Sequence, residues 1–199
     1  MRIILLGMPG AGKGTQAQII EEELAIANVS TGAILREVSK SKSDLGQKVQ
    51  TYLNSGQLVP DEIIIEMLVE RISKDDCNNG FILDGFPRNI EQAKSLDQAG
   101  VSIDLVIYLK ILEEQIIERM SGRRIHLASG RSYHTTFNPP KVDGKDDLTG
   151  EDLVQRSDDK PDVIKKRLEV YFNETEPMLD FYKNKDIQFY EIDASEPVK

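Results

Sequence analysis

The most constraining feature of the sequence is a glycine-rich stretch, GMPGAGKGT, at residues 7–15. It follows the apolar run RIILL at residues 2–6 and leads into a segment of helical pattern at residues 15–23. Glycines let successive backbone N–H groups turn inward around a phosphate, and the positive end of a following helix adds to the attraction. The stretch therefore predicts a phosphate-binding loop between a buried strand and a helix.

One position of this loop departs from the commonest phosphate-loop pattern, G-x-x-x-x-G-K-[ST], in which a hydroxyl follows the lysine. Here Gly14 follows Lys13, and Thr15 comes one residue later. Either the match is accidental, or the loop serves a chemistry that does not use that hydroxyl to hold magnesium.

Buried strands are expected at several further places. Short apolar runs occur around Val29 and at residues 81–83, 105–109 and 187–192. Apolar residues at helical spacing occur at residues 61–73, at residues 113–121 and from Pro161 onward. Strands that alternate with helices indicate βαβ units, and therefore an α/β fold with a parallel sheet.

Ligands of a parallel sheet bind at the carboxyl ends of its strands. The glycine-rich loop ends one predicted strand, and Asp84 ends another in the stretch LDGFPR at residues 83–88. A strand-ending aspartate is typical of phosphate-loop enzymes, although before Gly85 it would also suit a turn or a helix cap. Arg88 favours the phosphate interpretation, because a guanidinium can donate to two phosphate oxygens at once.

The segment at residues 123–159 breaks the alternating pattern. It contains paired prolines and three glycines and has little helical period. It is too long for a plain loop, and short alternating pieces such as residues 131–137 suggest a small β insertion that forms a lid.

The charge balance limits the partners. The net charge of −9 argues against nucleic acid as a main partner, because phosphate backbones attract basic surfaces. Any phosphate site must therefore be a local basic cluster. The candidate members are Arg36, Arg88, Arg119, Arg123, Arg156 and Arg167.

Cysteine usage and hydropathy indicate the compartment. The single Cys77 excludes an internal disulfide and fits a reducing cytoplasm. No apolar run reaches the ~20 residues that span a bilayer, so we expect no membrane association.

Five motifs together resemble the adenylate kinase family, in its long-lid bacterial form. They are GMPGAGKGTQ, STGAILR, LDGFPR followed by Gln92, GRR at residues 122–124, and RSDD followed by KKRL. The resemblance runs nearly end to end and implies a monomer with a three-layer phosphate-loop fold around a five-stranded parallel sheet. It also implies a core of residues 1–29, 60–121 and 160–199, a helical AMP-binding domain at 30–59 and a β lid at 122–159.

The resemblance implies MgATP + AMP ⇌ 2 ADP, and hence a role in adenine nucleotide homeostasis. The residues expected to hold ATP are Gly10, Ala11, Gly12, Lys13, Gly14, Thr15, Arg119, Arg123, Ser132, Tyr133 and Glu196. Those expected to hold AMP are Thr31, Arg36, Gln57, Leu58, Val59, Gly85, Phe86, Pro87, Arg88, Gln92, Arg156 and Arg167. The Gln92 amide suits this role, because it can pair with a donor and an acceptor on an adenine edge.

The groups expected around the moving phosphoryl are cationic. They are Lys13, Arg88, Arg123, Arg156 and Arg167. In this family magnesium is held largely by water and by nucleotide phosphates, which explains a loop without the usual hydroxyl. Asp84 would orient the waters of that ion, with help from Asp158 and Asp159. No general base is required, since the attacking AMP oxygen is already anionic.

Some relatives bind structural zinc in the lid through two cysteine pairs. The matching positions here are His126, Ser129, Asp146 and Thr149. The thiolates are absent and a site without soft ligands would bind zinc weakly, so we expect a hydrogen-bonded network and no structural zinc.

The sequence departs from the family pattern in three places. Ala33 replaces an aspartate that follows Ser-Thr-Gly, with an expected cost of about 1 kcal/mol from a lost cap. Glu196 stands where a lysine or glutamine is common near the ATP ribose and base. Relatives continue past the position of Lys199 into a helix that packs on the sheet, so we expect exposed apolar surface and lowered stability.

Three other functions are alternatives to an adenylate kinase. The nearest is a kinase for another nucleoside monophosphate, such as UMP or CMP, which Gln92, Thr31 and the full-length lid disfavour. A GTPase-like switch would need the motif N-K-x-D, and the stretch Asn184-Lys185-Asp186 lacks the spacer. The intact arginine set argues against an inactive nucleotide sensor.

Overall fold

The fold is built on a five-stranded parallel sheet. The computed structural model describes residues 1–196. The strands are β2 (Ala27–Ser30), β3 (Phe81–Asp84), β1 (Arg2–Gly7), β4 (Leu105–Lys110) and β8 (Gln188–Asp193), in that spatial order. Every neighbouring pair is parallel. The predicted α/β class and all five predicted strand positions are confirmed.

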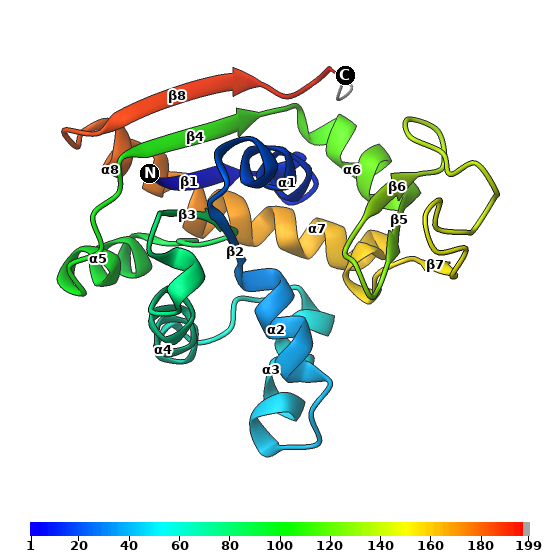
Figure 1. Cartoon of the computed structure of the whole chain (residues 1–199), viewed down its shortest axis with the longest axis horizontal. Coiled ribbons are helices and arrows are strands. Elements are labelled where there is room, and N and C mark those ends of the chain that lie inside the picture. Colours follow the sequence, from blue (N-terminus) through cyan, green and yellow to red (C-terminus); the bar gives the residue numbers. More distant parts are fainter. Residues whose placement is uncertain (197–199) are drawn as a thin grey trace.

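Helices cover both faces of this sheet (Figure 1). They are α1 (Lys13–Leu24), α4 (Asp61–Ile72), α5 (Ile90–Gln98), α6 (Glu113–Gly122), α7 (Pro161–Val170) and α8 (Pro177–Lys183). Along β1, Ile4 and Leu6 face one apolar cluster while Ile3 and Leu5 face another that includes Ala17 of α1. This alternation is the period of two that a strand buried on both faces requires.

The helical segment that follows Pro161 is interrupted. After α7 the chain forms a π-helical turn at Tyr171–Thr175, in which Glu176 N donates to Tyr171 O at 2.9 Å, and only then enters α8. The apolar spacing through Phe172 predicted one regular helix, so the interruption is a correction. Thr175, the last residue of this turn, contacts the backbone of Arg88 in the loop after β3.

Two groups of elements lie outside the layered core. α2 (Thr31–Ser39) and α3 (Asp44–Ser55) project on the side of the molecule away from β8 (Figure 1). Beyond α6, β5 (Arg123–His126), β6 (Ser132–His134) and β7 (Leu153–Val154) form an antiparallel sheet in the order β6-β5-β7. The first insertion follows the carboxyl end of β2, and the second lies between α6 and α7.

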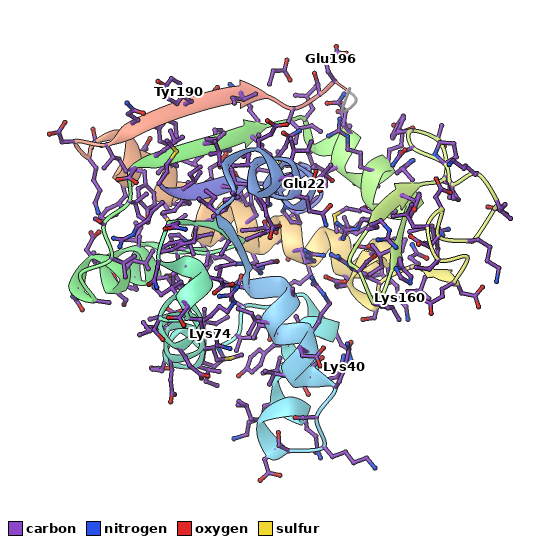
Figure 2. The ribbon with its side chains drawn as sticks, viewed as in Figure 1. Glu22, Lys40, Lys74, Lys160, Tyr190 and Glu196 are labelled. Carbon is purple, nitrogen blue, oxygen red and sulfur yellow. The ribbon has the colours of Figure 1, made fainter. Side chains whose placement is uncertain are left out.

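The edge strand β8 exposes apolar side chains. Tyr190, labelled in Figure 2, is 55% exposed and Ile192 is 46% exposed. Exposed apolar surface was expected near this end of the chain. Residues 197–199 of the predicted core lie outside the described residues, within which no helix is long and apolar enough to cross a membrane.

Candidate active site

The glycine-rich loop has the backbone geometry that a phosphate cradle needs. Gly12 has φ +98° and immediately precedes α1, while Gly10 has φ +84°. A Cβ at Gly10 would lie 2.7 Å from Met120 Cγ, whereas one at Gly12 would meet nothing within 4 Å. Gly10 is therefore required by packing as well as by its backbone, and Gly12 by its left-handed backbone alone.

The Lys13 side chain folds back onto backbone carbonyls of its own loop. Its Nζ donates to Gly7 O at 2.7 Å and to Met8 O at 2.8 Å. Burial, together with the nearby arginines, lowers the pKa of Lys13 to about 7, and Asp84 opposes them. A bound polyanion would reverse this imbalance, because negative charge favours the protonated amine.

Asp84 lies beside the loop at the end of β3. Ser30 Oγ donates to Asp84 Oδ2 at 3.2 Å, and a Cβ at Gly14 would lie 3.5 Å from the same oxygen. The carboxylate therefore faces the first turn of α1, at the position where common phosphate loops carry a hydroxyl. An oxygen donor of this kind suits a hard cation such as Mg²⁺.

The predicted arginines converge on this sheet end from different elements. Arg123 makes a bidentate pair with Asp159, at 2.8 Å and 2.5 Å, and Arg167 Nη1 donates to Asp158 Oδ2 at 2.8 Å. Arg88 Nε donates to Gly85 O at 2.7 Å. Asp158 and Asp159, predicted to help place magnesium, thus hold arginines in this structure.

The cluster carries more positive than negative charge. The pKa of Arg88 is lowered to about 10 and that of Arg156 to about 9, mainly because both side chains are buried. The charges of Arg123 and Arg36 also lower the pKa of Arg156. Burial also lowers the pKa of Arg36 and Arg167. Guanidinium groups with these values remain cations at neutral pH.

Arg156 is the least compensated member. Its Nε is buried and has no hydrogen-bond partner among residues 1–196. Buried donors without partners are rare in proteins, and each calls for an explanation such as a functional role. By contrast, burial raises and the surrounding arginines lower the pKa of Asp158, and the arginines prevail.

Several of the residues predicted to hold AMP are joined by hydrogen bonds around the loop after β3. Thr31 Oγ1 donates to Gly85 O at 2.9 Å, and Gln92 Oε1 accepts from Arg88 N at 2.7 Å. Val59 and Phe86 are buried. A narrow pocket here is lined by Thr31, Ile34, Leu35, Ile64, Met67 and Leu68. Its apolar members were not singled out in the sequence, where they are indistinguishable from core residues.

Gln57 and Leu58 line a different and wider pocket. Its other lining residues come from α7 and the π-helical turn, and they are Lys166, Val170, Asn173 and Glu174. The two predicted AMP residues therefore form part of the wall between α3 and α7, while Val59 belongs to the apolar core cluster.

The residues predicted to hold the ATP base and ribose are spread over three segments. Arg119 Nη2 donates to the backbone carbonyls of Ser195 at 2.8 Å and Glu196 at 3.4 Å. Glu196, labelled in Figure 2, thus contributes its backbone rather than its carboxylate to this contact. Ser132 is exposed, whereas Tyr133 is buried and its hydroxyl donates to Asp146 Oδ1 at 3.0 Å.

The hydrogen-bonded network predicted in the lid is confirmed. His126 Nδ1 contacts Ser129 Oγ at 2.7 Å, and Thr149 Oγ1 donates to Asp146 Oδ2 at 2.9 Å. Arg131 adds a bidentate pair to Asp146, at 2.8 and 2.6 Å, which was not predicted. Among the described residues, no group of three or more His, Cys, Asp or Glu side chains is arranged to hold a metal.

Two contacts near the site were missed. Thr175 Oγ1 donates to Arg88 O at 2.6 Å, across 87 positions of sequence. Asp61 accepts from Gln92 Nε2 at 2.6 Å, across 31 positions. A lone threonine and a helix-starting aspartate have ordinary local explanations, so no sequence signal could have identified either contact.

Known proteins resemble this chain in sequence. A sequence model of the family described as adenylate kinase matches residues 5–187. The adenylate kinase of Francisella philomiragia is 53% identical over 204 residues, covering 100% of this chain and 94% of its own. That of Francisella tularensis subsp. novicida is 58% identical over 184 residues, covering 92% of this chain and 84% of its own. The chain belongs to the adenylate kinase family.

Proposed function

We infer that the protein transfers the terminal phosphoryl group of ATP to AMP and gives two ADP in a reversible reaction. The observation that carries this inference is the charge of the site. Six cations surround three carboxylates there, although the whole chain carries a net charge of −9. The cations are Lys13, Arg36, Arg88, Arg123, Arg156 and Arg167. A surplus of buried positive charge suits two nucleotides whose phosphates meet.

The catalytic work consists of positioning and charge stabilisation. The AMP phosphate oxygen is an anion and needs no base, and a phosphoryl group in transit spreads its charge over several oxygens. In this proposal Lys13 turns from the loop carbonyls to the phosphates. Arg88, Arg123, Arg156 and Arg167 donate to the transferring group, and the buried Nε of Arg156 gains its partner there.

The other nucleotide contacts extend from this centre. The loop at residues 10–15 wraps the ATP phosphates, while Arg119 and the segment through Glu196 lie against the adenine and ribose. Ser132 and Tyr133 close over that nucleotide, which requires movement of the lid. On the AMP side Arg36, the segment 57–59, the turn 85–88 and Gln92 hold the acceptor, with Thr31 supporting the turn.

Magnesium is the ion that adenylate kinases use with ATP. Asp84 fits a role in orienting the waters of this ion, because its carboxylate lies beside the loop and accepts a hydrogen bond from Ser30 rather than from an arginine. The ion would neutralise phosphate charge. Asp158 and Asp159 would act on the same assembly through Arg167 and Arg123.

Residues 30–59 and 122–159 are proposed to move as two domains against a core formed by 1–29, 60–121 and 160–199. Closure would exclude water, which would otherwise accept the phosphoryl group. Because the lid positions of zinc-binding relatives are filled by a satisfied hydrogen-bond network, the lid is proposed to fold without zinc. Metal analysis of purified protein tests this directly.

The protein is further proposed to act as a monomer in the cytoplasm. The buried thiol of Cys77 is consistent with a reducing compartment. Sedimentation at two protein concentrations tests the monomer, since a dimer would show a heavier species at the higher concentration.

The decisive experiment is coupled ADP formation from MgATP with AMP, CMP, UMP or GMP as acceptor and with no acceptor as control. Fast turnover with AMP alone is expected. Preference for CMP or UMP would indicate the rival kinase, and ATP binding without transfer to any acceptor would indicate an inactive nucleotide binder.

A further inference from the structure

Asp61 is a half-buried carboxylate in the first turn of α4 to which the proposed reaction gives no role. Its Oδ1 accepts from Gln92 Nε2 at 2.6 Å, and its two oxygens accept from Asn89 Nδ2 at 3.2 and 3.1 Å. Asn89 is fixed in turn, because its Oδ1 caps α5 by accepting from Gln92 N at 2.8 Å. Asp61 therefore joins α4 to the residue proposed to read the acceptor base.

The contacts of Gln92 leave only one orientation for its amide. A carboxylate can only accept a hydrogen bond and a backbone N–H can only donate one. The group facing Asp61 must therefore be Nε2, and the group facing Arg88 N, at 2.7 Å, must be Oε1. A flipped amide would set Oε1 against the carboxylate and Nε2 against an N–H group.

Within residues 1–196, each polar atom of this amide makes one hydrogen bond and can make one more. Oε1 retains a lone pair and Nε2 retains a hydrogen, since each atom can take part in two hydrogen bonds. Adenine offers an amino donor next to a ring-nitrogen acceptor, and hypoxanthine and guanine offer a carbonyl acceptor next to a ring N–H donor. The two kinds of base therefore require opposite orientations of the same amide.

We propose that Asp61 is a specificity-determining positioning residue, which fixes the Gln92 amide in the orientation that accepts AMP and rejects 6-oxopurine monophosphates. Two groups fix this orientation, the backbone N–H of Arg88 and the carboxylate of Asp61. Only the second can be changed by substitution without altering the main chain. This inference rests on the proposed function, in which Gln92 contacts the acceptor base.

The test compares Asp61→Asn with wild type, using AMP and inosine monophosphate (IMP) as acceptors. IMP presents the 6-oxo edge without the extra amino group of GMP. Asparagine can donate or accept, so the flipped amide loses one of its two repulsive contacts. We expect the ratio of kcat/KM for AMP to that for IMP to fall about tenfold, the usual scale of a hydrogen bond to a charged group. The change should appear in KM for AMP, with kcat at saturating AMP within about twofold of wild type.

Glu62→Gln is the matched control. Glu62 is exposed, lies in the same first turn of α4 and loses the same charge, but it does not contact Gln92. Its AMP to IMP ratio should equal that of wild type. An equal ratio in Asp61→Asn would overturn the proposal, as would a fall of the same size in Glu62→Gln.

A second variant covers the case in which Asp61→Asn folds poorly. Asn89→Ser keeps an oxygen that can cap α5 but removes the amide that holds the carboxylate, so it should lower the same ratio by a smaller factor. A ratio unchanged in Asn89→Ser, with Asp61→Asn unfolded, would also overturn the proposal. If wild type itself fails to use AMP, the proposed function is wrong, and that result is separate from any difference among the variants.

Discussion

The lid and the phosphate site are both rich in charged groups, but they differ in how these groups are paired. In the lid Asp146 receives hydrogen bonds from Arg131, Tyr133 and Thr149. In the phosphate site Arg156 Nε is buried with no partner among the described residues, and the hydrogen bonds of Lys13 Nζ within residues 1–196 go to backbone carbonyls. The comparison indicates that the charged groups of the lid are paired within the lid, whereas the cations of the phosphate site outnumber its carboxylates.

The largest effect is expected from Lys13→Met. Loss of the amine should lower kcat on the order of 10²–10³-fold, the scale for removing one pre-oriented charge from a transition state. The ligand-free protein should nevertheless melt at a higher temperature, because a buried cation near other cations is replaced by an apolar side chain. Thermal unfolding without nucleotide measures this, and a lower melting temperature would contradict the account of an uncompensated site.

A pair of arginine variants separates stabilising charge from uncompensated charge within one site. Arg123→Met should lower the free energy of unfolding by about 3–5 kcal/mol, because it removes the bidentate partner of the buried Asp159 carboxylate and leaves that carboxylate with the more distant Arg167 Nη1, at 3.8 Å. Arg156→Met leaves no comparable orphan and should be neutral or stabilising, although both variants should lose activity. Denaturant unfolding of both variants measures the two changes in the free energy of unfolding. Equal destabilisation would contradict the difference between a paired and an unpaired arginine.

The pH dependence of the free energy of unfolding should reveal the lowered pKa of Lys13. Its pKa is lowered to about 7 in the folded protein, against an ordinary value of 10.5 for lysine. Between these values the unfolded chain binds a proton that the folded protein does not, so the free energy of unfolding rises with pH across this window. Below pH 7 Lys13 is protonated in both the folded and the unfolded state, so the full cost of burying its charge remains. The stability advantage of Lys13→Met should therefore shrink from about pH 7 to pH 10, and a constant difference would contradict it.

The smallest of these effects is expected in the lid. Arg131 lowers the pKa of Asp146, with further hydrogen bonds from Thr149 and Tyr133 outweighing the effect of burial. The stability it contributes is present above the usual aspartate pKa, about 4, and is lost as pH falls below that value. Asp146→Asn should lower the melting temperature at pH 7 and make the lid more sensitive to protease.

Asp143→Asn is the matched control for this change, because Asp143 is an exposed carboxylate of the same insertion. It should behave like wild type. Equal protease sensitivity of the two variants would mean that the lid network contributes no local stability.

Sequence reasoning succeeded where the signal is local. The glycines of the loop and the apolar runs of the five strands follow from the backbone and burial needs of neighbouring residues. It failed where the determinant is a distant partner, as for Asp159 with Arg123, which are 36 positions apart. The helix α5 was not predicted, and the π-helical turn escaped notice because Phe172 keeps the spacing of a regular helix.

The glycine after Lys13 also has a consequence for how such loops can change over time. A side chain at position 14 would begin 3.5 Å from Asp84 Oδ2. A serine introduced there would place a hydroxyl within reach of that carboxylate, and a loop hydroxyl beside a strand-ending aspartate is the pair of groups that holds magnesium in the commoner phosphate loops. The space beside Gly14 therefore connects the two styles of phosphate loop through a single position.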